Sequence, residues 1–446
     1  MAVYIEPKIL KGFRDFLPGA EIIRRGLTEK IENTFRSFGF APIDTPAVEY
    51  AEILLGKSGG ETEKQIYRFK DNGERDVALR FDLTVPFARF TALHKNELVF
   101  PFKRYHIGKV WRGENTQRGR YREFTQCDFD IIGSDSAASD FEILFLIRTV
   151  LLNLGLDVSI HVNHRGLFNR FLAHAEILNK STEILRAVDK LSKTGKDETE
   201  KNLAEIEGEE NARKILEFTG LKGSFTEVLD QITELSGGPS SQSQRLSDMA
   251  RFMNDACGAE LGADFFILDP SITRGLDYYT GVVFETFLNE LPDIGSICSG
   301  GRYDNLAGLY SKDRDSISGV GSSIGLDSLL AALESLKKLP EAESCQTAIA
   351  CVNAEKSGQY QALAQKLRFR GIPCEVFTES GEKQLVKQFI LAEKKGMRYV
   401  IIPGDDPLNE RITLRDLQTR QNTELTIEEV LEKINITRTA LWKTSC

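Results

Sequence analysis

The stretch from residue 103 to residue 133, KRYHIGKVWRGENTQRGRYREFTQCDFDIIG, limits the possible folds of this chain more than any other stretch. Its flanks are rich in aromatic and β-branched residues, which favour strands, and its centre, GENTQRG, has the composition of a polar loop. The stretch therefore predicts two strands joined as a hairpin. Because the whole chain has a net charge of −9, the local excess of cations in this hairpin indicates an anionic partner. Up to residue 122 the only carboxylate is Glu114, and the cations are Lys103, Arg104, Lys109, Arg112, Arg118, Arg120 and Arg122.

Side chains on the second strand of this hairpin alternate between two faces. One face is mostly apolar and is expected to pack in the core. The other face mixes guanidinium, aromatic, amide and carboxylate groups, which need partners when they are half buried on a sheet. Guanidinium groups match phosphate oxygens, a Phe ring can stack on a base, and a carboxylate can hold an ammonium group. This face predicts a site where a nucleotide meets an amino acid, and the alternative is a solvated edge hairpin with alternating charges. Its members are Arg120, Arg122, Phe124, Gln126, Asp128 and Asp130.

The composition excludes several classes of protein. A length of 446 residues predicts two or three domains, at roughly 100 to 200 residues per domain. A net negative charge argues against a protein that coats nucleic acid by bulk charge, but not against one that grips a folded RNA through local basic patches. The 7 cysteines are scattered without C-x-x-C spacing, so neither a disulfide framework nor a metal site is expected. No apolar run approaches the roughly 20 residues of a membrane span and no signal segment is visible, so a cytoplasmic protein without a membrane partner is expected.

The remaining patterns predict mixed α and β structure. A helix is expected from about residue 21 to residue 38, and a hairpin is expected around Asn72-Gly73. From residue 170 to residue 255, Leu and Ile recur at helical spacing, which predicts a run of helices. After residue 345 the pattern alternates strand and helix, and this order implies a small, mostly parallel sheet. No G-x-G-x-x-G or P-loop motif follows any strand there, which argues against an ordinary nucleotide-binding domain.

A second polar motif, RGLDYYTG at residues 274–281, joins two predicted strands. Arg274, Tyr278 and Tyr279 are large polar residues beside glycines, and glycines allow a ligand or a backbone to approach closely. The sequence CSGGRYDNL follows at residues 298–306. We expect these two motifs to share one cleft with the polar face of the basic hairpin.

These motifs resemble the histidyl-tRNA synthetases, a family of class II aminoacyl-tRNA synthetases. The basic hairpin, with GRYREF and QCDFDIIG, resembles motif 2 of that class, and RGLDYYTG and CSGGRYDNL look like the two histidine-binding signatures of the family. The segment FAPIDTPAVEYAEILLGKSG resembles motif 1, which builds the dimer interface in the family, so a homodimer is implied.

The resemblance extends from about residue 8 to residue 435 and implies an α+β fold. A class II antiparallel sheet core flanked by helices would occupy residues 1–169 and 256–335. A helical insertion at residues 170–255 would contact the acceptor arm of tRNA, or serve only as a structural appendage. A C-terminal α/β anticodon-binding domain would occupy residues 345–436, where unpaired anticodon bases can be splayed onto side chains.

The implied activity is that of a histidine–tRNA ligase. ATP would activate L-histidine to histidyl-adenylate with release of pyrophosphate, and the histidyl group would pass to the terminal ribose of tRNA(His). Mg²⁺ ions bridging the phosphates are implied by the family, although the sequence contains no obvious carboxylate cage for them.

The resemblance also implies roles for individual residues. Arg274 would stabilise the charge that develops at the α-phosphorus, and Arg112 would hold the α-phosphate; these two are the expected catalytic residues. For Asp82 and Thr84 a plain helix N-cap is the alternative interpretation. The Gly300-Gly301 pair would clear space for the imidazole. The residues implied for ATP are Arg112, Glu114, Arg120 and Phe124, the last stacking on adenine. The residues implied for histidine are Asp82, Thr84, Gln126, Asp130, Arg274, Tyr278, Tyr279 and Tyr303.

One position departs from the family pattern. The sequence Gly325-Leu326-Asp327-Ser328 resembles the start of the motif 3 helix, where the family has an arginine on the γ-phosphate of ATP. Serine cannot make that contact, and its loss would cost about 1.5 to 3 kcal/mol. Three interpretations follow: a cation such as Arg314 or Arg118 replaces it, activity is lowered, or the chain is a histidine-sensing regulatory subunit related to that of ATP phosphoribosyltransferase. That paralogue typically lacks an anticodon-binding domain, so retained ligase activity is favoured.

Overall fold

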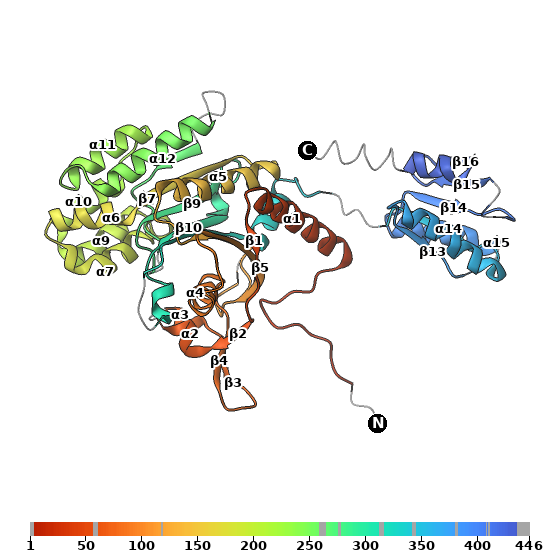
Figure 1. Cartoon of the computed structure of the whole chain (residues 1–446), viewed down its shortest axis with the longest axis horizontal. Coiled ribbons are helices and arrows are strands. Elements are labelled where there is room, and N and C mark those ends of the chain that lie inside the picture. Colours follow the sequence, from red (N-terminus) through yellow and green to blue (C-terminus); the bar gives the residue numbers. More distant parts are fainter. Residues whose placement is uncertain are drawn as a thin grey trace. The chain divides into compact units, whose positions relative to one another are not determined.

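The computed structural model describes residues 4–56, 61–116, 119–257, 265–274, 278–311, 316–340, 345–379, 382–406, 408 and 411–434 (Figure 1). The chain divides into two compact units. One comprises residues 1–15 and 27–339, and the other comprises residues 16–26 and 340–446. Helix α1 (Pro18–Ser37) therefore contributes to both units, and it starts and ends close to the predicted bounds.

The larger unit is organised around an eight-stranded sheet with the order β1-β5-β6-β11-β10-β9-β7-β8. From β5 to β7 every neighbouring pair is antiparallel, and only the two edge strands pair in parallel. Together with the flanking helices, this sheet confirms the predicted α+β fold. The strands are β1 (Ala41–Pro42), β5 (Phe102–Trp111), β6 (Glu123–Ile132), β7 (Val158–His164), β8 (Phe266–Leu268), β9 (Val282–Leu288), β10 (Cys298–Tyr303) and β11 (Gly319–Gly325).

The basic hairpin forms as predicted. Strands β5 and β6 pair antiparallel along their full length, from Phe102 opposite Ile132 to Trp111 opposite Glu123. Both faces of the inner half of β6 are buried, because apolar Cys127 and Phe129 alternate with buried polar residues such as Asp128. The polar face of this strand is therefore not a solvated edge.

A smaller antiparallel sheet with the order β2-β4-β3 projects from the same unit (Figure 1). Strands β3 and β4 flank Asn72-Gly73, so this predicted hairpin is also confirmed. Helix α4 follows β4 and brings its N-terminus to the edge of the candidate site described below. The elements of this region are β2 (Val48–Tyr50), α2 (Ala51–Leu55), α3 (Glu61–Gln65), β3 (Arg68–Lys70), β4 (Asp76–Leu79) and α4 (Thr84–Leu93).

Helix α5 (Ala137–Asn153) lies along the large sheet and contacts β6, β7, β10 and β11 (Figure 1). Its N-terminus is capped by Ser136, whose hydroxyl accepts a hydrogen bond of 3.1 Å from the backbone N–H of Ala138. Helix α13 (Leu326–Ser335) follows β11 directly, as the motif 3 pattern predicts. Short 3-10 turns occur at η4 (Pro292–Ile294) and η5 (Ala307–Tyr310).

The region predicted to be helical forms a cluster of helices beyond β7 (Figure 1). Helix α12 packs on α5, and α11 packs on α6 and β8, so the cluster is joined to the sheet through several elements. Helix α11 begins with a capping box formed by Ser224 and Glu227. The elements are α6 (Arg165–His174), η1 (Leu178–Lys180), α7 (Ser181–Val188), α8 (Leu191–Thr194), α9 (Lys196–Glu207), α10 (Glu209–Thr219), α11 (Phe225–Leu235) and α12 (Ser241–Cys257).

The smaller unit contains a five-stranded sheet with the order β13-β12-β14-β15-β16. The first three strands are parallel and the last two form an antiparallel hairpin, as predicted. Tyr360, Leu363 and Leu367 of α14 are buried in its core. The elements are β12 (Thr347–Ile349), η6 (Ala354–Lys356), α14 (Ser357–Phe369), β13 (Cys374–Val376), α15 (Glu382–Lys394), β14 (Tyr399–Ile402), β15 (Ile412–Asp416), β16 (Asn422–Leu425) and a final helical segment at 427–434. In the part of the chain described, no helix is long and apolar enough to cross a membrane.

Candidate active site

A cavity of about 520 Å³ opens in the larger unit over the middle strands of the large sheet. Its wall contains both the loop that carries Arg274 and the polar face of β6, so the two motifs share one cleft as expected. The predicted site residues that line the cavity are Asp82, Thr84, Arg112, Gln126, Asp130, Arg274, Tyr278, Tyr279 and Tyr303.

Arg274 is fixed in the cavity wall by a contact of its own side chain and by a contact of the residue before it. Its guanidinium makes a short hydrogen bond and ion pair with the Glu285 carboxylate on β9. The preceding Thr273 hydroxyl donates a 3.1 Å hydrogen bond to the backbone oxygen of Leu185 in α7. Burial lowers the pKa of Arg274, but the adjacent carboxylate more than offsets this and raises the pKa overall, so the side chain stays cationic. Arg274 also has a φ of +56°, which is unusual for a residue with a side chain.

The tyrosines stand beside this cation. The ring centroids of Tyr278 and Tyr279 lie 4.7 Å apart. The Tyr303 hydroxyl donates a 2.5 Å hydrogen bond to Oδ1 of Asp130. Burial and the Asp130 charge hold the pKa of Tyr303 well above its ordinary value. Each tyrosine is therefore a neutral hydroxyl that can donate to, or accept from, a polar ligand.

The glycines of the second signature serve the protein rather than the ligand directly. A Cβ on Gly301 would lie 2.8 Å from the Tyr279 ring, and a Cβ on Gly300 would lie 2.1 Å from the backbone oxygen of Gly321 on β11. The expectation that Gly300-Gly301 clears space for an imidazole is therefore corrected: the tyrosine ring and the neighbouring strand occupy that space. Gly321 has the matching role for Asp130, since a Cβ there would lie 1.9 Å from the carboxylate.

Asp82 fits both interpretations offered for it. Its Oδ1 accepts hydrogen bonds from the backbone N–H groups of Thr84 at 3.1 Å and Val85 at 2.9 Å, so it caps the start of α4. It also lines the cavity together with Thr84. Burial raises the pKa of Asp82, and the two N–H groups and Arg112 offset part of this rise.

The residues predicted for the nucleotide are only partly brought together. Arg112 lines the cavity, donates a 3.1 Å hydrogen bond from Nε to the backbone oxygen of Phe81, and stacks 5.2 Å from the ring of Phe124. The Phe124 ring therefore packs against the Arg112 guanidinium. Neither Phe124 nor Glu114 nor the exposed Arg120 is among the described residues that line the cavity.

A buried ion pair between Arg104 and Asp130 lies on the polar face. Arg104 is fully buried, with Nη2 placed 2.6 Å from Oδ2 of Asp130 and the guanidinium 4.1 Å from the ring of Phe87. Arg104 lies directly opposite Asp130 in the hairpin register, and opposite charges at such positions stabilise a strand pair. Counting residues outward from the hairpin loop along both strands could have predicted that Arg104 pairs with Asp130. Burial raises the pKa of the adjacent Asp128 to about 7, with Arg104 opposing and Asp130 adding to the rise.

Ser328 lines the cavity at the start of α13. Its hydroxyl donates a 3.1 Å hydrogen bond to the backbone oxygen of Gly119, which belongs to the loop of the basic hairpin. The neighbouring Asp327 pairs with Arg14 and accepts a 2.8 Å hydrogen bond from the backbone N–H of Thr125. The start of this helix is therefore tied to the hairpin. Arg118 and Arg314, the cations suggested as substitutes, lie outside the described residues.

Sequence reasoning missed part of the cavity wall. Helix α7 and the turn after it contribute cations and a carboxylate to the cavity, although the helical region gave no sequence signal for this. In the part of the chain that the structure describes, no group of three or more His, Cys, Asp or Glu side chains could hold a metal ion. The missed wall residues with polar side chains are Gln65, Arg186, Asp189, Lys190, Ser296, Ser299, Tyr310, Ser322 and Ser323.

Comparison with known proteins gives one consistent result. A family model described as histidyl-tRNA synthetase matches residues 12–329, and a model described as anticodon binding domain matches residues 346–436. A histidine–tRNA ligase of Treponema denticola is 51% identical, covering 98% of this chain and 100% of that protein. A histidine–tRNA ligase of Rhodopirellula baltica is 44% identical, covering 94% of this chain and 96% of that protein. The crystal structure of histidyl-tRNA synthetase from Nostoc has a TM-score of 0.84 at 30% identity, covering 97% of this chain and 100% of that one.

The family model spans most of the chain, and a relative aligns with it almost from end to end at 51% identity. The cavity, with its arginine, tyrosines and buried carboxylates, lies within the matched residues. The chain therefore belongs to the histidyl-tRNA synthetase family.

Proposed function

We propose that this chain is a histidine–tRNA ligase that forms histidyl-adenylate from L-histidine and ATP and passes the histidyl group to tRNA(His). The observation that carries the proposal is the convergence of Arg274, the tyrosines and the polar face of β6 on one cavity. The curated relatives that align over nearly the whole chain are named histidine–tRNA ligases, which supports the same activity.

We assign histidine to the inner part of this cavity. The ammonium group is assigned to Asp82, Thr84 and Gln126, because a buried carboxylate, a hydroxyl and an amide oxygen can accept hydrogen bonds from its N–H groups. The Asp130–Tyr303 pair and Tyr279 are suited to the imidazole. A site built from such hydrogen-bonding groups rejects analogues that leave them unpaired. Tyr278, whose ring contacts Tyr279, would complete this wall.

The chemical step is an attack of a histidine carboxylate oxygen on the α-phosphorus of ATP, which breaks the bond to pyrophosphate. Arg274 would lie at the reacting carboxylate and Arg112 at the α-phosphate, where two fixed cations stabilise the negative charge of the transition state. Phe124, Glu114 and Arg120 are proposed to contact the nucleotide after it binds. Mg²⁺ would supply further neutralisation of phosphate charge, held mainly by the phosphates, since the described residues offer no acidic cluster for it.

The other parts of the chain are assigned by the same family pattern. We propose a catalytic domain at residues 1–169 and 256–335, a helical insertion at 170–255 that contacts the tRNA, and an anticodon-binding domain at 345–436. We also propose a homodimer in the cytoplasm. Val48 and Tyr50, on the strand of the motif 1 segment, are large hydrophobic residues that are exposed in the single chain, and a second copy would bury them.

Pyrophosphate exchange tests this proposal. Purified protein incubated with ATP, Mg²⁺ and labelled pyrophosphate should form labelled ATP only when L-histidine is present, and it should then charge tRNA(His). Chain that binds histidine in calorimetry but shows no exchange would instead be a histidine-sensing regulatory subunit. Exchange that any other amino acid supports equally well would contradict the assignment of the cavity to histidine.

Ser328→Arg should strengthen ATP binding. The side chain lines the cavity, so a guanidinium there can reach phosphate oxygens that the serine hydroxyl cannot. We expect the KM for ATP in pyrophosphate exchange to fall about tenfold, as one added charge-assisted contact would give. The control is Ser328→Gln, which has similar bulk without the charge and loses the same hydrogen bond to Gly119. An equal KM in wild type and Ser328→Arg would show that another cation already serves the γ-phosphate.

A further inference from the structure

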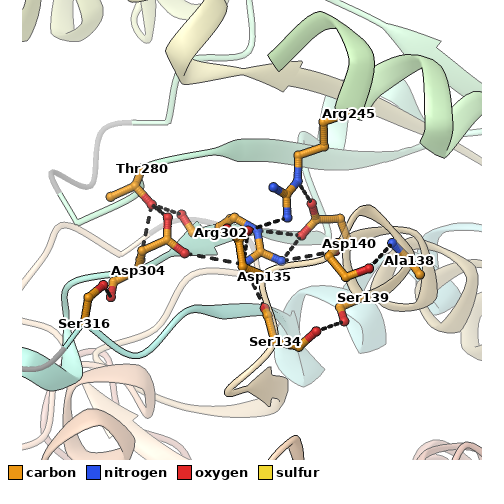
Figure 2. Close-up of polar contacts among 11 residues, drawn as sticks. Ser134, Asp135, Ala138, Ser139, Asp140, Arg245, Thr280, Arg302, Asp304 and Ser316 are labelled. Atoms are coloured by element: carbon orange, nitrogen blue, oxygen red, sulfur yellow. Dashed lines mark hydrogen bonds and ion pairs between the residues drawn. The ribbon is translucent and has the colours of Figure 1, made fainter. Parts of the chain in front are cut away.

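A network of buried charges joins the helical region to the histidine-binding strands (Figure 2). At its centre the Asp140 carboxylate of α5 accepts hydrogen bonds from two arginines. Arg302 of β10 donates to Oδ1 from Nε at 2.9 Å and from Nη2 at 2.6 Å. Arg245 of α12 donates to Oδ2 from Nε at 2.6 Å. Asp140 and Arg302 are buried, so the carboxylate has exchanged water for these two cations.

Arg302 lies on the opposite side of the sheet from the cavity. Neighbouring residues on a strand face opposite sides, and Tyr303 lines the cavity. Arg302 instead points to α5, where its Nη1 donates a 3.1 Å hydrogen bond to the backbone oxygen of Ser134. It therefore cannot touch substrate, and any influence it has on histidine must pass through the strand that carries Tyr303.

The same arginine also holds the segment that carries Tyr279. The backbone N–H of Thr280 donates a 2.8 Å hydrogen bond to the backbone oxygen of Arg302. A Cβ on Gly281 would lie 2.9 Å from Cδ of Arg302, so the two pack in direct contact. The Thr280 hydroxyl donates a further 2.5 Å hydrogen bond to Asp304. A shift of Arg302 would displace both the Tyr303 strand and the Tyr279 segment.

Arg245 completes this arrangement from the helical region. Besides Asp140, its Nη2 donates a 2.8 Å hydrogen bond to Asp135 at the turn before α5 (Figure 2). One guanidinium thus spans two carboxylates, and α12 is fastened to the N-terminal end of α5. Without Arg245, Oδ2 of Asp140 would lose its hydrogen-bond donor. The Asp140 carboxylate, which holds Arg302, could then rotate.

We propose that Arg245 is a positioning residue for histidine: acting through Asp140 and Arg302, it sets the placement of Tyr303 and Tyr279, so docking of the helical region on α5 and affinity for histidine are coupled. This inference rests on the proposed function, in which these tyrosines bind the imidazole. It gives the helical region a role in recognition of the amino acid in addition to any contact with RNA.

The test is Arg245→Gln, assayed by pyrophosphate exchange with the full chain. We expect the KM for histidine to rise about fivefold, within the range by which residues along a contact network alter binding, while the KM for ATP and kcat stay within about twofold of wild type. The matched control is Arg251→Gln on the same helix, because Arg251 pairs only with Asp248 and Asp255 of α12 among the described carboxylates. Arg245→Lys, which keeps one cation beside Asp140 but cannot span both carboxylates, should restore only about half of the lost affinity.

The outcomes separate this inference from the function on which it rests. Wild-type chain without histidine-dependent exchange would contradict the function itself. If the wild type shows exchange, two results for Arg245→Gln would overturn the positioning role and leave a structural one. One is an unchanged KM for histidine, and the other is an equal rise in the KM for histidine and the KM for ATP. If Arg245→Gln does not fold, Arg245→Lys decides: a raised histidine KM with an unchanged ATP KM supports the inference, and unchanged values of both reject it.

Discussion

Arg274→Gly is expected to reduce kcat for histidine-dependent pyrophosphate exchange by at least about 100-fold, the usual effect of removing one fixed donor at a site of developing negative charge. The substitution removes the cation that lies in the cavity wall against Glu285. Glycine is chosen because Arg274 has a φ of +56°, which glycine adopts without strain. The loss of rate should therefore come from the missing guanidinium and not from a distorted loop.

Arg274→Ala is the matched control for the backbone. It removes the same charge but keeps a Cβ at a left-handed position, so it should lose as much kcat as the glycine variant and be less stable by about 1 kcal/mol. Thermal unfolding of the two variants measures that difference. Folded Arg274→Gly with kcat within tenfold of wild type would remove Arg274 from the catalytic step.

Asp130→Asn is expected to destabilise the chain by about 3 kcal/mol and to raise the KM for histidine. Arg104 has no exposed surface, and its contact with Asp130 is an ion pair at 2.6 Å without an aligned hydrogen bond. Its charge is therefore compensated mainly by the negative charge of the carboxylate, which an amide cannot supply. Urea titration at neutral pH measures the change in the free energy of unfolding.

The neighbouring Asp128 provides the control. The folded chain keeps a proton on Asp128 up to a pKa of about 7, whereas the unfolded chain releases it near 3.8, so this group makes the free energy of unfolding fall as pH rises between these values. In Asp130→Asn the repulsion between the two carboxylates is gone, so the pKa of Asp128 drops. The free energy of unfolding should therefore fall less steeply as pH rises. Asp128→Asn combined with Asp130→Asn should cost more than the sum of the two single changes. If the two single changes in the free energy of unfolding are strictly additive, Asp128 and Asp130 do not jointly compensate the charge of Arg104.

Local patterns in the sequence predicted the fold well. The hairpin of residues 102–132 and the turn at Asn72-Gly73 depend on strand-forming flanks and turn-forming centres that lie within one short window. The helical run and the alternating C-terminal pattern likewise depend on periodicity. Such features need no knowledge of the partners that each element meets.

The sequence predicted the site residues that belong to a recognisable motif. It did not predict the residues that reach the cavity through tertiary packing. Arg274 and Asp130 were placed in the cavity by their motifs, but Arg186 and Lys190 reach it only because α7 docks beside the Arg274 loop. The ring of Phe124, predicted to stack on adenine, packs against the Arg112 guanidinium and is not among the described residues that line the cavity. These positions depend on contacts between segments far apart in the chain, and local sequence patterns do not predict such contacts.

The position of β11 in the large sheet has a consequence for synthesis of the chain. This strand, Gly319–Gly325, is the last of the sheet in sequence, yet it lies between β6 and β10 at its centre. Until the ribosome has released it, the nascent chain presents two unpaired strand edges, each a template for aggregation. The sheet is also rich in non-local contacts, which slow folding. Protection of these edges by a chaperone during translation would therefore raise the yield of native protein.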